Sequence, residues 1–164
     1  MTDLLRIPAC AGIRHAQVGL VYSLSGTMSR EESRRRARAT AIVVRSGKVL
    51  LVREAGVHYF SLPGGGMHEG ENAEVAAARE IWEELGIVAV KAERLRECDH
   101  TGFMNDHHVC LIQADRDPRL RGDELDAFCW WDMEESIPLH PHVRAILSKV
   151  DGLGKLDSHR HKED

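Results

Sequence analysis

A glycine-rich loop followed by an acidic helix is the feature that most constrains the fold of this chain. The stretch Leu62–Gly66 contains Pro63, which fixes one φ angle, and three consecutive glycines, which permit backbone geometry closed to other residues. We therefore expect neither an ordinary helix nor an ordinary strand there. Residues Glu74 to Leu85 follow with helical periodicity, and Gly86 is well placed to cap the C-terminus of that helix.

The predicted helix has two contrasting faces. Carboxylates at i, i+3 and i+4 share one face, and they are Glu80, Glu83 and Glu84. The opposite face, which can pack against a sheet, collects Val75, Ala78, Ile81, Trp82 and Leu85. Carboxylates at this spacing weaken an isolated helix by roughly a few tenths of a kcal/mol per pair. A divalent cation among them explains the clustering. The alternative is a solvated acidic surface on which Arg79 pairs with Glu83.

The segment Gly65–Ile87 also has a characteristic spacing. It contains, in this order, Gly65, Glu71, Arg79-Glu80-Ile81, Glu83-Glu84 and Gly86-Ile87. These residues fill every position of the Nudix box, so the chain strongly resembles a large family of metal-dependent pyrophosphohydrolases. One departure is His68, where many members have Glu. The resemblance implies an α/β fold, specifically an α/β/α sandwich with a mixed β-sheet in a single domain.

The resemblance further implies a bound Mg²⁺ or Mn²⁺. The ligands that it implies are the main-chain carbonyl of Gly65 and the carboxylates of Glu80, Glu83 and Glu84. A divalent cation would bridge these carboxylates to substrate phosphates and lower the pKa of a water molecule. The catalytic base is then Glu80 or Glu83, because relatives differ in which glutamate serves.

Other residues of the box are expected to support this chemistry. Arg79 is expected to orient a glutamate through a bidentate hydrogen-bonded pair, with Glu71 as the candidate partner. The loop glycines can bring main-chain amides and carbonyls close to a phosphate or a metal. We therefore expect substrate contacts at Gly64, Gly65 and Gly66.

A second acidic stretch, Asp123–Asp126, precedes the aromatic segment Phe128–Trp131. Relatives often carry an acidic residue just before a Trp-containing strand, where it adds a metal ligand or a base. Glu124 is the candidate for that position and for a substrate contact. The alternative for this stretch is a surface turn.

The segment His107–Cys110 contains zinc-ligand residue types. Neighbouring residues of a strand point to opposite faces, however, so His107 and His108 cannot both ligate one ion from a regular strand. An ordinary strand position, or a histidine facing the substrate cleft, is the favoured interpretation.

We expect hydrolysis of a phosphoanhydride bond in a nucleoside diphosphate linked to another moiety. Sequence marks of the ADP-ribose, dinucleoside polyphosphate and NADH subfamilies are missing after the box, which favours a nucleoside triphosphate or a nucleotide sugar. One alternative is an RNA 5′-end pyrophosphohydrolase that grips RNA through Arg30–Arg38. Another is a nucleotide-binding regulator without turnover, although such proteins usually lose glutamates of the box.

The remaining elements are predicted from alternation and turn residues. The expected strands are Thr40–Val44 and Val49–Val52, flanking a turn at Ser46–Lys48, and then Ala89–Cys98, His107–Ala114 and Phe128–Trp131. A loop is expected at Pro118–Asp123 and a last helix at His142–Val150.

Three regions are expected along the chain. Residues 1–37 form an extension in which a capping-box pattern at Ser29–Glu32 predicts a short helix up to Arg36. Residues 38–150 form the Nudix domain, and residues 151–164 form a polar, mobile tail. Met28 is a hypothetical translation start, which an intact-mass measurement would decide.

Composition limits the partners of the chain. The 164 residues include 26 acidic and 22 basic side chains, and this mild net charge of −4 gives no global attraction to nucleic acid or membrane. No apolar run approaches the ~20 residues of a membrane span. The four cysteines are widely spaced, which favours reduced thiols and a cytoplasmic location. We therefore expect a small nucleotide as the partner, with RNA as a less favoured ligand. We expect no membrane association, and a homodimer remains one alternative.

Overall fold

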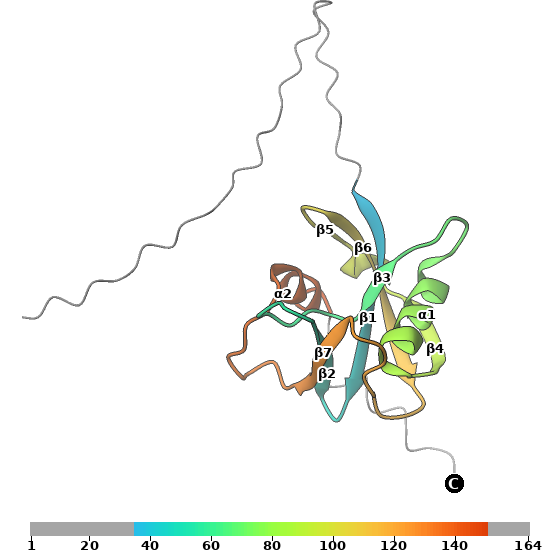
Figure 1. Ribbon diagram of the computed structural model, residues 1–164. Helices are drawn as coiled ribbons and strands as arrows, with labels where there is room; N and C mark the ends of the chain where they lie inside the picture. The colour runs from blue at the N-terminus through green and yellow to red at the C-terminus, as the bar shows by residue number, and fades with distance from the viewer. Residues whose placement is uncertain (1–34, 151–164) are drawn as a thin grey trace, which may run out of the picture. The chain divides into compact units, whose positions relative to one another are not determined.

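A mixed β-sheet forms the centre of the computed structural model, which describes residues 35–150 (Figure 1). Its strands are β1 (Arg36–Arg45), β2 (Lys48–Glu54), β3 (Gly64–Gly66), β4 (Ala89–Arg94), β5 (His100–Thr101), β6 (Asn105–Ala114) and β7 (Leu125–Trp131). The helices are α1 (Ala73–Leu85), α2 (Pro141–Leu147) and a short 3-10 turn, η1 (Arg96–Cys98). The strand order is β4-β6-β1-β2-β7, with β3 paired to β1 and β5 paired to β6. Strands β1 and β6 are parallel and the other pairs are antiparallel.

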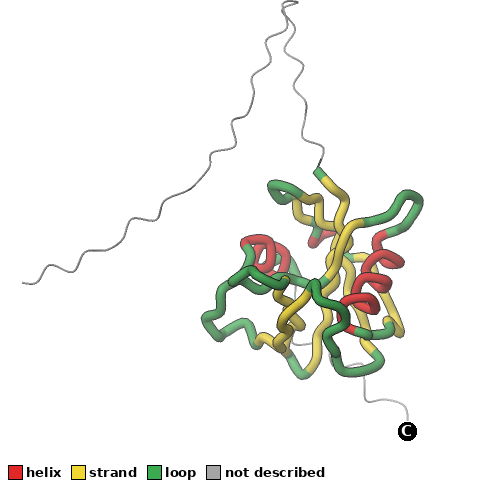
Figure 2. Tube along the Cα trace, viewed as in Figure 1, coloured by secondary structure: helices red, strands yellow, loops and turns green. Residues whose placement is uncertain are grey.

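The sheet lies between the two helices, as Figure 2 shows. Residues of β1 alternate between two apolar clusters, because successive side chains of a strand point to opposite faces. Ala41 and Val43 pack in the cluster that contains the buried face of α1. Ile42 packs in the other cluster, together with Val143 and Ile146 of α2. The predicted mixed sheet covered on both faces is therefore confirmed.

Strand β1 shares one of its edges between two partners. Near its start, Arg38–Thr40 pairs with β3, and at its end Val44 and Arg45 pair with β2. A tight turn at Ser46 and Gly47, both with positive φ, reverses the chain between β1 and β2. The glycine loop is thus held against β1 in the middle of the sheet, while β2 pairs with β7.

The prediction that no strand forms within Leu62–Gly66 is wrong for its last three residues. Glycines 64–66 form β3, and Gly64 adopts φ 133°, a conformation that side chains of L residues rarely take. A Cβ atom at Gly64 would overlap the main-chain carbonyl oxygen of Ala39. The missing side chain therefore lets this short strand approach β1 closely.

Helix α1 agrees with its predicted span to within one residue. Asn72 caps its N-terminus, where the side-chain oxygen accepts a hydrogen bond of 2.8 Å from the amide of Val75. Gly86 ends the helix in the left-handed conformation, and its N–H donates to carbonyls of the last turn. Both ends are thus fixed by local side-chain and backbone chemistry.

The buried face of α1 differs from the predicted one. The side chains that pack on the sheet are Ala73, Ala76, Ala77, Ile81 and Leu85. Val75, Ala78 and Trp82 were expected on that face, but Ala78 is only half-buried and Val75 and Trp82 are 55% and 49% exposed. Small alanines allow the helix to lie close to the sheet, and this rotates its contact face away from Val75 and Trp82.

Three other elements differ from expectation. The strand predicted at Ala89–Cys98 ends at Arg94, and the 3-10 turn η1 follows. The last helix begins at Pro141 and ends at Leu147. The helix predicted up to Arg36 does not reach that residue, because Arg36 starts β1 and pairs with Asn105 of β6. The earlier part of that helix, Met28 and the tail at 151–164 lie outside the described residues.

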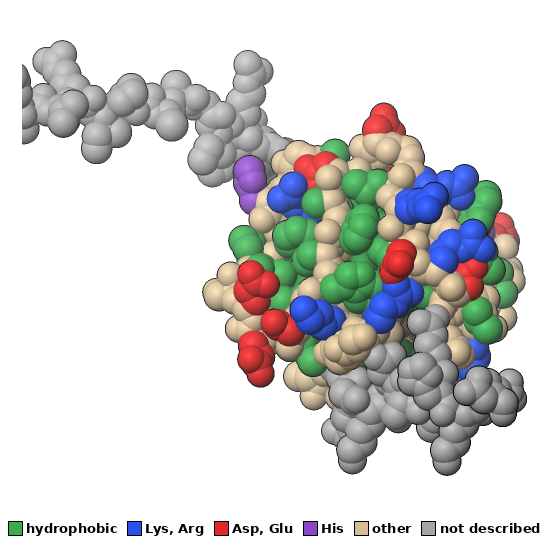
Figure 3. Space-filling view, turned by 90° about the horizontal axis from the view of Figure 1, so that it is seen from below, with side chains coloured by type: hydrophobic (Ala, Val, Ile, Leu, Met, Phe, Trp, Pro, Cys, Tyr) green, Lys and Arg blue, Asp and Glu red, His purple; other side chains and the backbone are tan. Residues whose placement is uncertain are grey.

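The surface of the described part is mixed in character. Figure 3 shows one face on which hydrophobic side chains gather in the middle, with basic and acidic side chains around them. Within residues 35–150, no helix has the length and apolar composition needed to cross a membrane. The longer of the two α-helices, α1, has 13 residues.

Candidate active site

The glycine strand β3 lies directly against the acidic face of α1. The amide of Gly64 donates a hydrogen bond of 3.3 Å to the carboxylate of Glu84. A Cβ atom at Gly65 would overlap the carboxylate of Glu80. The structure therefore brings together the loop glycines and the carboxylates, which sequence spacing alone places 15 to 20 residues apart.

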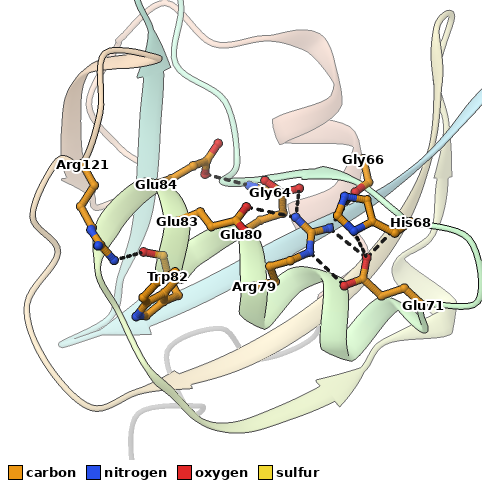
Figure 4. A network of polar contacts seen from close by, with 10 residues as sticks. All are labelled: Gly64, Gly66, His68, Glu71, Arg79, Glu80, Trp82, Glu83, Glu84 and Arg121. Carbon is orange, nitrogen blue, oxygen red and sulfur yellow. Dashed lines mark hydrogen bonds and ion pairs between the residues drawn. The ribbon is translucent and has the colours of Figure 1, made fainter.

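Arg79 connects the acidic residues of this region (Figure 4). Its Nε and Nη2 donate to the two carboxylate oxygens of Glu71, at 3.0 and 2.9 Å. Its Nη1 donates to Glu80 at 2.7 Å and to Glu83 at 3.1 Å. A further bond of 3.0 Å runs from Nη2 to the carbonyl of Gly66. The expected bidentate pair with Glu71 and the alternative i,i+4 pair with Glu83 are thus both present.

Mutual hydrogen bonding keeps Arg79 and Glu71 charged. The guanidinium of Arg79 lowers the pKa of Glu71 to about 2, and Glu71 in turn raises the pKa of Arg79. Glu71 also accepts a hydrogen bond of 3.0 Å from the amide of His68. This pair therefore ties the loop after β3 to the first half of α1.

Glu84 has the opposite electrostatic situation. Burial raises the pKa of Glu84 to about 7, against the lowering effects of the positive charge of Arg38 and of the Gly64 amide. Within residues 35–150, the Gly64 amide is the one hydrogen-bond donor to this carboxylate, and no ion pair reaches it. A half-buried carboxylate with a single hydrogen-bond donor is stabilised by a cation.

The residues fit a hard divalent cation in their chemistry. Glu80, Glu83, Glu84 and the Gly65 carbonyl offer oxygen ligands only, which suits Mg²⁺ and Mn²⁺. In the described part of the chain, no three acidic, histidine or cysteine side chains converge as a ready-made metal site. Glu80 and Glu83 instead point to Arg79. A few carboxylates and one carbonyl are typical of Mg²⁺ sites in which waters and substrate phosphates supply the remaining ligands.

A cavity of about 360 Å³ opens beside these carboxylates. Its walls come from the end of α1 and from the loop before β7, and they comprise Glu80, Trp82, Glu83, Glu84, Arg121, Gly122, Asp123 and Glu124. Glu124 therefore shares one cavity with the three glutamates of α1. Nothing in the sequence indicated Arg121, because no motif marks it and only its packing on α1 reveals it. Trp82 was expected in the core but lines this cavity.

A second cavity of about 160 Å³ lies on the α2 side of the sheet. It is lined by Arg38, Glu54, Val57, Tyr59, Ser61, Asn105, His107, His140 and His142. The ring of His142 lies between those of His107 and His140, with centroid distances of 4.4 and 4.3 Å. We call this the histidine cavity. A cleft-facing histidine at 107 or 108 was one of the interpretations of the sequence, but no sequence pattern indicates that these segments meet.

The histidines of this cavity are uncharged near neutral pH. Burial lowers the pKa of His107 to about 4 and that of His142 to about 2. His107 shares a hydrogen bond of 2.9 Å with the hydroxyl of Thr40. His142 is 6% exposed, and neither of its ring nitrogens has a hydrogen-bond partner among residues 35–150. His108 lies apart from this group, beside Arg94 and Asp99.

Comparison with known proteins identifies the family. The family model described as NUDIX domain matches residues 34–150. This chain belongs to the NUDIX family. The Nudix signature at Gly65–Ile87 therefore lies inside a domain whose whole length fits the family, and the predicted membership is confirmed.

Individual Nudix relatives agree with this assignment. A solved structure of a nudix hydrolase family member from Chromobacterium violaceum is 31% identical, covers 71% of this chain and 76% of its own, and has a TM-score of 0.61. An RNA pyrophosphohydrolase of Shewanella piezotolerans is 49% identical over 43 residues, which are 26% of this chain and 25% of the relative. A protein of Bacillus subtilis, predicted to be an 8-oxo-dGTP diphosphatase, is 38% identical over 64 residues, which are 39% of this chain and 43% of the relative. The chain thus matches less than half the length of either curated relative.

Proposed function

We propose that this Nudix protein hydrolyses a phosphoanhydride bond in a nucleoside diphosphate linked to another moiety, with Mg²⁺ or Mn²⁺ as cofactor. The observation that carries the proposal is the shared cavity of about 360 Å³, in which Glu80, Glu83 and Glu84 face Glu124 beside the glycine strand. Family membership supports the reaction class. The complete box argues against a regulator without turnover.

The metal would be held by Glu80, Glu83, Glu84 and the Gly65 carbonyl. Without a cation, this acidic cavity would repel the phosphates of the substrate. When bound, the cation neutralises phosphate charge and lowers the pKa of a water molecule. Glu80 or Glu83 accepts the proton of the attacking water. Both carboxylates are within hydrogen-bond distance of Arg79, which orients them for this task.

The preferred substrates are a nucleoside triphosphate or a nucleotide sugar. We assign the nucleoside to the histidine cavity, because the ring centroid of His142 lies within 4.4 Å of those of His107 and His140, and aromatic rings of this kind can contact a planar base. The diphosphate would then extend along β3, whose Gly64 contacts Glu84 and whose Gly66 pairs with Arg38 of the histidine cavity. Glu124 lies at the phosphate end, where it would reach the substrate through the cation or act as a base.

A second candidate substrate is the 5′ end of RNA. It is favoured by the similarity of 49% over 43 residues to an RNA pyrophosphohydrolase. The reaction at the phosphoanhydride would be the same, so the two candidates differ in what lies beyond the first nucleoside.

A substrate panel tests the proposal. Purified protein is incubated with nucleoside triphosphates, nucleotide sugars and 5′-triphosphorylated RNA, each with Mg²⁺, with Mn²⁺ or with chelator, and products are identified by mass. We expect metal-dependent cleavage of a phosphoanhydride bond in at least one nucleotide, and its loss in Glu83→Gln. Turnover that persists in chelator, or no cleavage of any compound in the panel, contradicts the proposed function.

A further inference from the structure

Arg121 is a basic side chain in an acidic cavity. Of the residues that line the cavity of about 360 Å³, it alone is basic, whereas Glu80, Glu83, Glu84, Asp123 and Glu124 are acidic. It comes from the loop before β7 and reaches the end of α1, as Figure 4 shows. The loop before β7 thus places the positive side chain of Arg121 beside the carboxylates of α1.

The last turn of α1 holds Arg121 in place. Its guanidinium carbon lies 4.4 Å from the ring centroid of Trp82. Its Nη1 donates a hydrogen bond of 3.1 Å to the Trp82 carbonyl, and its own amide donates to the carbonyl of Glu84 at 2.9 Å. At Gly86, a Cβ atom would lie 3.2 Å from the Cδ of Arg121, so the side chain packs closely over this glycine.

Helix capping alone does not account for Arg121. The carbonyl of Trp82 already accepts a hydrogen bond of 3.0 Å from the amide of Gly86. Arg121 forms no ion pair within residues 35–150, although acidic side chains line the same cavity. A guanidinium carries five N–H donors, and one of them is engaged here. The remaining donors are available to a ligand in the cavity.

The ligand that fits these donors is a phosphate. A guanidinium binds two phosphate oxygens at once, and stacking on an aromatic ring preorganises its plane. We propose that Arg121 binds the outer phosphate of the substrate, at the end remote from the nucleoside; this inference rests on the proposed function. The acidic side of the cavity would meet the phosphates through the divalent cation, and Arg121 would meet them directly.

The test measures binding of two ligands in the presence of Mg²⁺. The first is a nucleoside triphosphate whose bridging oxygens are replaced by methylene groups, and the second is the corresponding nucleoside monophosphate. By titration calorimetry, Arg121→Ala should lower affinity for the triphosphate analogue about ten- to hundredfold, as for loss of a charged hydrogen bond, and leave monophosphate affinity unchanged. Arg121→Lys should recover part of the loss, since it keeps the charge but not the bidentate geometry.

Arg119→Ala is the matched control. Arg119 lies in the same loop, is exposed, and its amide also bonds to α1, at the Leu85 carbonyl, but its side chain does not line the cavity. Its replacement should change neither affinity. In turnover, Arg121→Ala should raise KM for the triphosphate more than it lowers kcat.

Two results would overturn the inference while the proposed function stands. One is wild-type affinity of Arg121→Ala for the analogue. The other is an equal loss for both ligands together with a lower thermal midpoint, which is the behaviour of a residue that only caps the helix. If the wild-type protein binds no analogue and cleaves no nucleotide, the proposed function fails, and this inference fails with it.

Discussion

At the scale of single residues, Arg79 shows how one side chain can organise a site. The sequence predicted two competing partners for it, Glu71 and Glu83. The structure has both, because the five donors of a guanidinium can serve several acceptors at once. Spacing along a helix identifies the neighbours of such a residue, but only the folded loop supplies Glu71 and the Gly66 carbonyl.

Replacing Arg79 by lysine tests this arrangement. Arg79→Lys keeps the positive charge but cannot form the two parallel bonds to Glu71 or reach all of the present acceptors. We expect kcat/KM to fall by about ten- to hundredfold, the equivalent of one charged hydrogen bond. Arg119→Lys, an exposed change outside the cavity, should leave kcat/KM unchanged. Wild-type turnover of Arg79→Lys would show that the network does not orient catalytic groups.

Gly64 provides a second test at this scale. Gly64→Ala places a side chain against the carbonyl of Ala39 at φ 133°, so we expect a loss of about 1–3 kcal/mol or more in the free energy of unfolding. Gly66→Ala, in the same strand, has open space around its Cβ position and should be close to neutral. Urea denaturation measures both variants. Equal stabilities for the two would contradict the close approach of β3 to β1.

At the scale of elements, local signals and tertiary contacts account for different features. The ends of α1 were predictable because Asn72 and Gly86 act within a few residues of the helix. Its buried face was not, because the sheet selects alanines rather than the larger Val75 and Trp82. Strand β3 was unpredictable for a similar reason. Three glycines have no strand preference of their own, and pairing with β1 alone makes them a strand.

The N-cap of α1 gives a test of this local control. Asn72→Ala removes the bond to the Val75 amide and should lower the free energy of unfolding by about 1 kcal/mol. Asn72→Asp, which retains an acceptor at the same place, should be nearly neutral. Thermal or urea unfolding compares the two variants. A loss in Asn72→Asp equal to that in Asn72→Ala would assign the effect to something other than capping.

At the scale of the whole molecule, the carboxylates of α1 and the histidine cavity differ in how far the sequence could predict them. The carboxylates belong to one continuous motif, so their grouping was predictable from spacing. The histidine cavity joins β1, β6, the segment 54–61 and the start of α2. Tertiary contacts bring these segments together, among them the parallel pairing of β1 with β6 and the packing of α2. Arg121 and Glu124 likewise depend on where the loop before β7 crosses α1.

The buried histidines predict how global stability changes with pH. In the unfolded chain a histidine takes up a proton near pH 6.5, whereas folded His107 and His142 have pKa values of about 4 and about 2. The unfolded state therefore binds more protons below pH 6.5, and the free energy of unfolding falls as the pH falls. Each histidine should contribute a slope of about 1.4 kcal/mol per pH unit between pH 6 and 4.5.

Urea denaturation at several pH values checks this slope. His142→Gln removes one of these two histidines. It should therefore halve the part of the slope that His107 and His142 contribute together. An unchanged slope in His142→Gln would contradict the neutral buried state of that ring.

The carboxylates of α1 are proposed to hold a divalent cation, and the proposed hydrolysis depends on that ion. A titration with Mn²⁺, followed by electron paramagnetic resonance of the free ion, measures this directly in the wild-type protein and in Glu83→Gln, Glu84→Gln and the control Glu97→Gln. We predict saturable binding that the first two substitutions weaken at least about tenfold, the equivalent of one lost ligand. The exposed Glu97 should have no effect. Equal Mn²⁺ affinity in all four proteins would contradict the account.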